Sequence, residues 1–457
     1  MNIRSTAKLA LLLLTSITLS SNSSCESANK EQWRDLFDGK TLNGWKAVGG
    51  KAPYTVEDGA IVGTMVKGTP NSFLITEQEY GDFILELEIK LEGTETNSGI
   101  QTRSHINDKG RVYGRQVEID PTARAWSGGI YDESRRLWLY PVDLNENAKS
   151  AYKVEEYNHV RIEAIGDETK TWLNGVPVAY LIDTLDPTGF IALQVHSIPD
   201  HLAGKKVYFK NIRIQTENLQ PRDFPADIHI VNLKTNHLSQ AEEKAGYKLL
   251  FDGKSPAGWR SVRSNSFPEK GWEIKDGAIT VLKSDGGEST NGGDIVTEQQ
   301  YSAFDLSFEF QLTPGANSGV KYFVTLKEQT TGSAIGLEYQ ILDDEKHPDA
   351  KMGRDGNRTL ASLYDLITAN KSPRGLKPVG EWNRGRLVVT PDNQVTHYLN
   401  GFKVLSYTRG SDEYHNLVER SKYKGWENFG LAEKGHILLQ DHGDRVSFRN
   451  IKLKTLD

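Results

Sequence analysis

The stretch Phe83-Ile84-Leu85-Glu86-Leu87-Glu88-Ile89-Lys90-Leu91 alternates apolar and polar residues from Leu85 to Leu91. Successive side chains of a β-strand point to opposite faces, so this period of two places Leu85, Leu87, Ile89 and Leu91 on one face. Residues 304–312 (FDLSFEFQL) repeat the pattern. Both stretches therefore predict half-buried strands.

Shorter alternating segments occur throughout the chain, and Gly, Asn and Asp residues separate them. No long stretch carries the 3.6-residue apolar stripe of an amphipathic helix. The pattern predicts an all-β protein made of antiparallel sandwiches or jelly rolls. Further strands are expected at 159–165, 170–173, 190–195, 206–214, 335–342, 385–390, 395–399, 436–440 and 445–453.

The chain contains an internal repeat as long as a domain. LFDGK at 36–40, followed by Gly44-Trp45, recurs at 250–254, followed by Gly258-Trp259. Later motif pairs follow in the same order, among them NSG at 97–99 and 317–319 and LNG at 173–175 and 399–401. Solenoid repeats are far shorter, so two tandem copies of one fold are expected. We place the domains at 31–216 and 246–457, with a linker at 217–245.

The first residues have the pattern of an export signal. Arg4 and Lys8 precede an apolar stretch at 9–19, and a small polar run leads to Cys25, the only cysteine. Residues 1–25 are therefore expected to be a signal peptide that resembles those of bacterial lipoproteins. This predicts an exported protein, periplasmic or at the cell surface, held to a membrane only by a lipid on Cys25. Asn22 departs from the lipoprotein pattern, and the alternative is an incidental cysteine near a cleavage site.

The net charge of −6 gives no electrostatic reason to expect nucleic-acid binding. The chain has no phosphate-binding glycine loop, no paired Cys-x-x-Cys and no Gly-x-Ser-x-Gly motif. With a single cysteine, the domains cannot be held by internal disulfides. Trp45 and Trp259 stand beside turns that open each domain and are interpreted as core residues rather than ligand platforms.

A row of carboxylates and amides is the first candidate site. Period two places Gln116, Glu118 and Asp120 on one strand face. In the second copy Glu338 and Gln340 share a face, with Glu and Gln exchanged. Such a row suits a sugar or metal site, whereas the alternative is a solvated outer sheet face. Its presence in both copies favours a site.

The second candidate is Gln-x-His, present as Gln194 with His196 and as Gln440 with His442. Histidine titrates near neutral pH and can act as base, acid or metal ligand. A histidine hydrogen-bonded for structural reasons is an equal alternative.

The third candidate combines cations with tyrosines. Arg103 follows NSG in the first copy and Lys321 in the second, and either could stabilise an oxyanion or enolate. Tyr131-Asp132 and Tyr364-Asp365 form the matching aromatic and acidic pairs. Arg135 and Arg136, next to the first pair, are interpreted as partners in surface ion pairs. Residues 345–349 (EKHPD) could supply metal ligands, although a solvated loop is the favoured interpretation.

These motifs carry a family resemblance. LFDGKTLNGW, VEDGAIVG, NSGIQTRS, SGGIYDESRR, WLNGVPV and FKNIRI in the first half resemble the 3-keto-disaccharide hydrolase family. The second half is similar over LLFDGKSPAGW, LEYQILDDEKHPDA, GEWNRGRLVV, YLNGFKV and GHILLQDHGDRVSFRNIKL. The resemblance implies two concanavalin-like jelly-roll sandwiches, export in glycan-degrading bacteria and cleavage of 3-keto sugars. A sugar 3-dehydrogenase would be the functional partner that makes the substrate.

The implied chemistry needs a base, an electrophile and an acid. A ketone at C3 acidifies the C2 hydrogen, so a base can remove it and the enolate can expel the glycosidic oxygen from C1. Water addition to the enone then completes a net hydrolysis. For the second copy the hypothesis is Glu338 or His442 as base, Lys321 or a divalent cation held by Glu338 and Asp343 as electrophile, and Tyr364 or Asp365 as acid, with Gln340 beside them. For the first copy, Glu118, Asp120, His196 and Arg103 take these places. The residues expected to bind substrate are Gln116, Gln194, Tyr131 and Asp132 in the first copy and Gln440 in the second.

Two other functions are compatible with the same fold. A surface lectin would need a sugar site but no base, and a structural module would leave both clusters facing solvent. Convergence of the carboxylate and the imidazole in one pocket would favour the enzyme.

Overall fold

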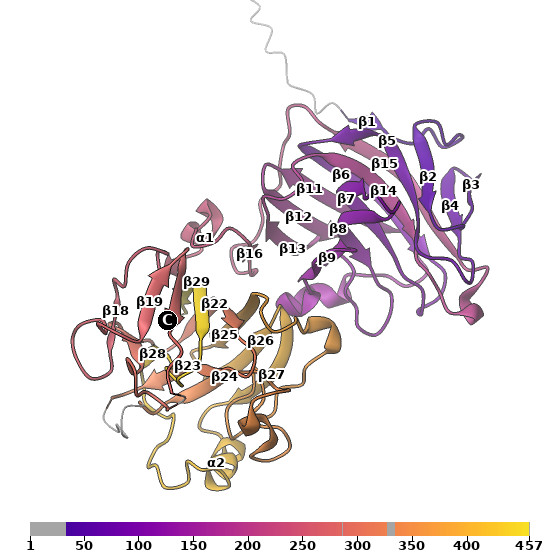
Figure 1. The fold of residues 1–457 in the computed structure, drawn as a ribbon. Coiled ribbons are helices and arrows are strands. Elements are labelled where there is room, and N and C mark those ends of the chain that lie inside the picture. The colour runs from indigo at the N-terminus through magenta and orange to yellow at the C-terminus, as the bar shows by residue number, and fades with distance from the viewer. Residues whose placement is uncertain (1–32, 286, 327–333, 457) are drawn as a thin grey trace, which may run out of the picture.

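The structure is a computed structural model that describes residues 33–285, 287–326 and 334–456. It consists of two β-sandwich domains in tandem, the first coloured indigo to magenta and the second rose through orange to yellow in Figure 1. The all-β prediction and the two jelly-roll sandwiches are confirmed. The predicted signal peptide at 1–25 and Cys25 lie outside the described residues.

The first domain pairs a nine-stranded sheet, ordered β16-β13-β12-β11-β6-β15-β4-β3 with β1 on β15, with a seven-stranded sheet, ordered β10-β9-β8-β7-β14-β5-β2. The edge strand β16 (Val231–Asn232) comes from the segment after the domain. The other strands are β1 (Arg34–Asp35), β2 (Trp45–Gly49), β3 (Tyr54–Glu57), β4 (Ala60–Thr64), β5 (Ser72–Tyr80), β6 (Phe83–Leu91), β7 (Ser98–Ile106), β8 (Val112–Ile119), β9 (Ile130–Glu133), β10 (Leu137–Tyr140), β11 (Asn158–Ile165), β12 (Glu168–Leu173), β13 (Val176–Ile182), β14 (Gly189–Val195) and β15 (Lys206–Gln215), with 3₁₀ turns at Val142–Leu144, Glu146–Ser150 and Asp200–Leu202.

The second domain pairs an eight-stranded sheet, ordered β19-β20-β29-β22-β25-β26-β27 with β17 on β29, with a five-stranded sheet, ordered β18-β21-β28-β23-β24. Its elements are β17 (Lys248–Leu249), β18 (Trp259–Ser261), β19 (Trp272–Lys275), β20 (Ala278–Val281), β21 (Ile295–Thr297), β22 (Phe304–Leu312), β23 (Asn317–Val324), β24 (Leu337–Leu342), β25 (Asn383–Val389), β26 (Gln394–Leu399), β27 (Phe402–Thr408), β28 (His436–Leu439), β29 (Val446–Thr455) and helix α2 (Asp412–Glu419), with 3₁₀ turns at Pro348–Lys351 and Pro373–Gly375.

The two alternating stretches form β6 and β22 over the residues that the pattern predicts. Phe83, Leu85, Leu87, Ile89 and Leu91 all enter the core of the first domain. On the polar face of β6, Glu88 and Lys90 are partly exposed, as expected of a half-buried strand, whereas Glu86 is buried. Glu86 is only 3% exposed because Arg161 of β11 and Arg213 of β15 each donate to its carboxylate at 2.6 Å.

The repeated LFDGK motif builds the same turn twice. Asp38 accepts hydrogen bonds from the backbone N–H of Lys40 and Thr41 at 2.8 and 2.7 Å, and Asp252 does the same for Lys254 and Ser255. The glycine inside each turn has a positive φ, which a residue without Cβ adopts at little cost. The tryptophan that follows is buried and donates its indole N–H to the leucine carbonyl of the motif, as expected of a core residue.

The segment predicted as a linker at 217–245 packs against both domains. Its short strand β16 (Val231–Asn232) pairs in parallel with β13 of the first domain. Helix α1 (Gln240–Lys244) begins at Ser239 with a capping box formed with Glu242. Lys452 on β29 forms an ion pair with Glu242, so this helix is tied to the second domain.

The domains also contact each other directly. Phe402, at the start of β27, is part of the core of the first domain and packs edge-on against Trp126 with 5.1 Å between ring centroids. Arg384 of β25 donates to the carbonyl of Leu139 on β10 at 2.9 Å. The loop that ends at Gly401 lies against Pro141. The two sandwiches are therefore docked rather than joined by a free linker.

Among the described residues, no helix has the length and hydrophobicity needed to span a bilayer.

Candidate functional site

Each domain has a cavity on the outer face of its smaller sheet. On β24, Tyr339 and Ile341 point into the core, so Glu338 and Gln340 point to the other face. On β8, Val117 and Ile119 point into the core, and Gln116 and Glu118 point outward. The period-two rule therefore places both polar rows correctly, and each row lines a cavity.

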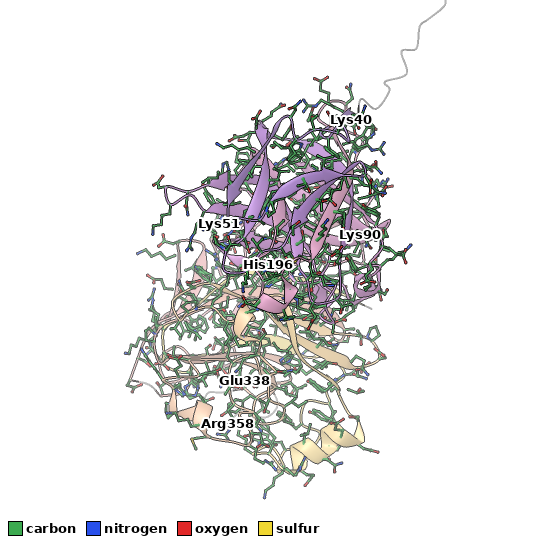
Figure 2. All side chains as sticks on the ribbon, turned by 90° about the vertical axis from the view of Figure 1, so that its right-hand side faces the viewer. Lys40, Lys51, Lys90, His196, Glu338 and Arg358 are labelled. Atoms are coloured by element: carbon green, nitrogen blue, oxygen red, sulfur yellow. The ribbon has the colours of Figure 1, made fainter. Side chains whose placement is uncertain are left out.

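The cavity of the second domain has a volume of about 250 Å³. Figure 2 shows Glu338 within this domain. The lining residues come from β23 and β24, from the loop before β21, from the segment just before β24, and from the loops that follow β24, α2 and β28: Glu288, Asn317, Lys321, Ile335, Glu338, Gln340, Tyr364, Lys422, Tyr423, Trp426, Gln440 and His442.

Lys321 and Glu338 are direct cross-strand partners between β23 and β24. Both are at most 5% exposed. Lys321 Nζ donates to the carbonyl of Ala334 at 3.2 Å and lies 3.9 Å from the carboxylate of Asp294. Burial raises the pKa of Glu338, and the nearby Lys321 opposes that shift. A buried carboxylate with a raised pKa is a stronger base than one in water, and Lys321 lies on the next strand to balance negative charge.

Tyr364 lines the same cavity, but its hydroxyl donates to Asp349 at 2.8 Å. Burial raises the pKa of this hydroxyl, with Glu338 adding to the effect. A hydroxyl held by a carboxylate is a weak proton donor toward a substrate, so the geometry favours Tyr364 as a binding group.

Asp365 does not line the cavity. Its carboxylate accepts from Arg358 and from the backbone N–H of Lys422, both at 2.7 Å. The position of Asp365 therefore does not support the predicted role as the acid. Its side chain instead holds the loop that carries Lys422.

Asp343 is also outside the cavity. Its carboxylate accepts hydrogen bonds from the backbone N–H groups of Gly315, Glu345 and Lys346. Burial raises the pKa of Asp343, but these hydrogen bonds outweigh burial, and the pKa is lowered overall. Glu338 and Asp343 therefore do not form the predicted metal pair. Their separation by five positions on an extended chain sends the two side chains to opposite faces.

A different trio, His347, His442 and Asp444, brings three potential ligand atoms within 4.8 Å of one another. His347 Nδ1 accepts a hydrogen bond from the backbone N–H of Asp349 at 3.2 Å. A neutral ring that accepts at Nδ1 carries its proton on Nε2, so neither nitrogen of His347 is available to a cation while that bond holds.

The cavity of the first domain is larger, at about 580 Å³. His196 lies at the edge of this domain that faces the second, as Figure 2 shows. The lining residues come from β8, β9 and β10, from the segments just before β5 and β7 and after β8 and β14, and from one turn of the second domain: Asn71, Glu95, Thr96, Asn97, Gln116, Glu118, Asp120, Thr122, Arg124, Tyr131, Glu133, Leu137, Trp138, His196 and Arg374.

The two cavities occupy equivalent places but carry different groups. Gly99 pairs with Glu118 as Gly319 pairs with Gln340, and Gln101 pairs with Gln116 as Lys321 pairs with Glu338. The Lys–Glu pair of the second domain is therefore a neutral Gln–Gln pair in the first, joined by a hydrogen bond of 2.8 Å. The carboxylate of the first cavity lies two positions further along the strand, at Glu118.

Glu118 and Glu133 are the two carboxyl groups with raised pKa values in the first cavity. Glu118 accepts from Asn97 at 2.7 Å and from Gln116 at 2.9 Å, yet burial still raises its pKa. Burial and the neighbouring Glu118 raise the pKa of Glu133 to about 6. Asp120, on the same strand face, accepts from Thr122 at 2.6 Å and from Arg124 at 2.7 Å.

Three residues assigned to the first site lie elsewhere. Arg103 is 1% exposed and donates to the carbonyls of Gly81, Ala164 and Gly166 and to Asp82, so it holds loops together. Asp132 has no exposed surface and pairs with Arg135 and Arg136. Gln194 is fully buried, whereas its counterpart Gln440 lines the second cavity.

Arg103 fails as a match to Lys321 because the strand is irregular there. The register of β7 against β8 shifts after Thr102, and Arg103 has φ of 45°. The residue at the equivalent place in β23 is Phe323, with φ of 55°, and the true counterpart of Lys321 is Gln101.

Several lining residues are not visible to strand-pattern reasoning. Lys422, Tyr423 and Trp426 reach the second cavity from the loop after α2, where no alternation marks them. Glu133 directly follows the Tyr131-Asp132 pair, so the position of that pair in the sequence could have pointed to it. Arg374 belongs to the other domain, and only the docking of the two sandwiches brings it to the first cavity.

The family model described as the 3-keto-alpha-glucoside-1,2-lyase-like domain matches residues 32–215 and 246–454. The chain belongs to the 3-keto-alpha-glucoside-1,2-lyase-like family. It carries two copies of the domain of that family, in agreement with the resemblance stated from its motifs.

A relative from Bacteroides thetaiotaomicron named 3-keto-disaccharide hydrolase is 38% identical over 237 residues, which cover 46% of this chain and 79% of that protein. A solved structure from Parabacteroides distasonis, assigned by name only to the glycosyl hydrolases, is 30% identical, with a TM-score of 0.43 over 49% of this chain and 100% of its own. A second structure from that organism is 27% identical, with a TM-score of 0.35 over 46% of this chain and 99% of its own. Membership in this lyase-like family supports a glycoside hydrolase-like enzyme acting on carbohydrates.

Proposed function

We propose that the chain cleaves 3-keto-glycosides and that the cavity of the second domain carries the reaction. The observation that supports this most directly is the buried cross-strand pair Lys321–Glu338, which shares one cavity with His442. A lectin needs no buried base, and an outer structural face would leave these side chains in water. Their burial and convergence favour the enzyme.

The first step is removal of the C2 proton by Glu338. Burial raises the pKa of this carboxyl group, which makes the carboxylate a better match for a weakly acidic carbon. Its outward position on β24 directs it into the cavity, where a sugar ring would lie.

The second requirement is a cation for the C3 oxygen, on which negative charge develops as the enolate forms. Lys321 lies on the neighbouring strand at the same register and is fixed by its hydrogen bond to Ala334. A fixed ammonium in a buried cavity stabilises that charge without reorganisation during the reaction. Lys422 lines the same cavity and adds positive charge.

The departing glycosidic oxygen needs a proton, and His442 is the lining residue suited to supply it. The enolate then reforms the ketone as the C1–O bond breaks, which leaves a C1=C2 enone and a free alcohol. Addition of water to that enone gives the net hydrolysis. Gln340, Gln440 and Asn317 offer amides to the sugar hydroxyls, and Trp426 offers an apolar face.

The proposal extends to the setting of the reaction. A sugar 3-dehydrogenase would supply the keto substrate, since the elimination requires a ketone next to the acidic C–H. On the sequence of residues 1–25, we also propose that the protein is exported and carries a lipid on Cys25.

The test compares Glu338→Gln and Lys321→Met with the wild-type chain on a methyl 3-keto-glucoside, with products identified by mass. Each variant should lose at least about 100-fold in turnover, as expected when a base or a charge-stabilising group is removed. Glu419→Gln, on the exposed side of α2, is the matched control and should leave turnover unchanged. Full activity in both site variants would refute this assignment.

A further inference from the structure

The cavity of the first domain contains a residue of the second. Arg374 lies on the 3₁₀ turn Pro373–Gly375, close to β10, and lines that cavity. Ser372 caps the turn by accepting from the backbone N–H of Arg374, and Gly375 packs against the ring of Phe402. Because Phe402 is itself part of the first-domain core, the turn that carries Arg374 is fixed relative to this cavity.

Among the described residues, Arg124 is the arginine that the first domain itself supplies to this cavity, and its guanidinium is already paired. Arg124 donates to Asp120 at 2.7 Å and to Glu118 at 3.4 Å, and its guanidinium stacks over Trp126 at 4.7 Å. The position that holds Lys321 in the second domain holds the neutral Gln101.

Arg374, unlike Arg124, is not held by a carboxylate of the described residues. Its side chain is exposed, and among the described residues its guanidinium makes no hydrogen bond or ion pair with the protein. Burial raises the pKa of Tyr131, with Glu133 and Glu118 adding to the rise, whereas Arg374 opposes it. Arg374 and Tyr131 line the same cavity, so the positive charge of the guanidinium faces the space where a substrate would lie.

The same cavity holds two carboxyl groups that are not neutralised by a close ion pair. Among the described residues, the partners of the Glu133 carboxyl group are Asn71 and Ser134, which both donate to it at 3.4 Å. Its counterpart position in the second domain is Leu366, one residue after Asp365, so this carboxyl group is a feature of the first domain alone. Glu118 is held by two amides, Asn97 and Gln116, and has only a long contact of 3.4 Å with Arg124.

We propose that the first-domain cavity is a second active site, completed across the domain boundary, in which Glu118 is the base, Arg374 the cation and Glu133 the acid. The chemistry rests on the function proposed for the second domain. Because the cavity is more than twice as large, its substrates are 3-keto-glycosides with a bulkier leaving group, such as a second sugar.

The step is balanced by these three groups. Glu118 takes the C2 proton, and the electron pair of that bond moves into the C2=C3 enolate, whose oxygen is stabilised by Arg374. The C3=O bond reforms, the pair shifts to C1=C2, and the C1–O bond breaks. The leaving oxygen takes the proton of Glu133, and transfer of the proton from Glu118 to Glu133 through water resets the site.

The experiment uses the full chain and two substrates, methyl 3-keto-glucoside and a 3-keto-disaccharide. With Glu338→Gln, turnover of the methyl glycoside should fall at least about 100-fold, whereas at least about a tenth of the disaccharide turnover should remain. Adding Arg374→Ala or Glu133→Gln should lower the remainder by about 10- to 100-fold, and Arg374→Lys should restore part of it. Arg354→Ala, at another exposed arginine of the same domain, is the control. Melting curves of all variants would be recorded to test that each variant is folded.

The possible results separate the two proposals. If Glu338→Gln abolishes turnover of both substrates equally, the second site does not exist, and the function proposed for the second domain stands. If disaccharide turnover remains but Arg374→Ala leaves it unchanged, the role of Arg374 is wrong. If Glu338→Gln changes neither substrate and Arg374→Ala abolishes both, the assignment to the second domain is wrong and the first-domain site is supported.

Discussion

Replacement of Glu133 by glutamine should stabilise the protein above neutral pH. Burial, with Glu118 adding to it, raises the pKa of Glu133 from 4.5 to about 6. A difference of about 1.5 in pKa corresponds to about 2 kcal/mol between the two protonation states. The side chain is part exposed and water screens some of this effect, so we expect about 1–2 kcal/mol.

The sign follows from the direction of the shift. Above about pH 6 the carboxyl group is ionised in the folded and in the unfolded chain, so the folded state bears the whole cost of holding a buried charge. Below about pH 4.5 both states are protonated and the cost disappears. Glutamine is neutral at every pH and keeps a carbonyl that can accept from Asn71.

Urea unfolding of the wild-type chain and Glu133→Gln at several pH values between about pH 4 and pH 8 measures this difference directly. The variant should be more stable by about 1–2 kcal/mol at the upper end, which for a domain of this size is a rise of about 2–8 °C in melting temperature. The gain should decline through about pH 6 and vanish near pH 4.

The exposed Glu79 on β5 provides the control, and Glu79→Gln should show no such pH-dependent gain. The reasoning would be refuted by a Glu133→Gln variant that is less stable than the wild type at pH 8. It would also be refuted by a gain of equal size at pH 4 and pH 8, because a packing effect of the amide, rather than the charge, would then be responsible.

Three further predictions follow from other parts of the structure. The rate of methyl 3-keto-glucoside cleavage should fall as the pH is lowered through the raised pKa of Glu338, because the base must be ionised, and Glu338→Asp should keep this pH dependence at a lower rate. Burial, with Arg386 adding to it, lowers the pKa of His229 far below its ordinary value, so the folded chain holds a neutral ring. The wild type should lose stability below about pH 6.5 relative to His229→Gln in parallel melting curves, and an unchanged difference across that range would contradict the prediction. Phe402→Ala should cost about 3 kcal/mol in unfolding free energy and speed proteolysis of residues 217–245, whereas an unchanged cleavage rate would show that this contact does not dock the domains.

The strands and the outward polar rows were predictable because both depend on local alternation. Glu338, Gln340 and Lys321 converge since neighbouring strands in register place them on one face, and the repeat showed which rows to compare. Arg103 was misassigned because alternation fails at a residue with positive φ, and nothing in the local sequence marks that conformation.

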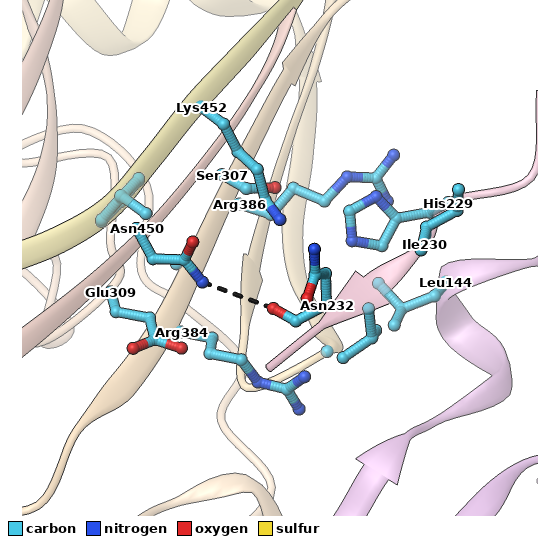
Figure 3. Close-up of a pocket in the computed structure, with 14 residues that line it drawn as sticks. Leu144, His229, Ile230, Asn232, Ser307, Glu309, Arg384, Arg386, Asn450 and Lys452 are labelled. Atoms are coloured by element: carbon cyan, nitrogen blue, oxygen red, sulfur yellow. Dashed lines mark hydrogen bonds between the residues drawn. The ribbon is translucent and has the colours of Figure 1, made fainter. Parts of the chain in front are cut away.

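Contacts between distant parts of the chain were not predictable in this way. Arg374 reaches the first cavity only because the domains dock. The docking involves Phe402, whose place after the LNG motif predicts nothing more than an ordinary strand residue. The same limit applies to the small cavity of about 40 Å³ between the linker and the second domain, shown in Figure 3. There His229 lies over the outer face of β22 and β25, and Asn450 donates to the carbonyl of Asn232 at 3.4 Å.

This buried interface explains why the two copies cannot be treated as separable units. The outer face of β22 in the second domain carries Asp305, Ser307 and Glu309, a row typical of a solvated strand. Asp305 is instead buried, because Arg386 donates to it at 2.7 Å and Tyr247 at 2.6 Å beneath the linker. Removing the linker would expose this charged layer, and removing the second domain would take Phe402 from the first core and Arg374 from the first cavity. A first domain expressed alone would therefore lack the cation of its own site, so its inactivity would say nothing about whether that site works in the whole chain.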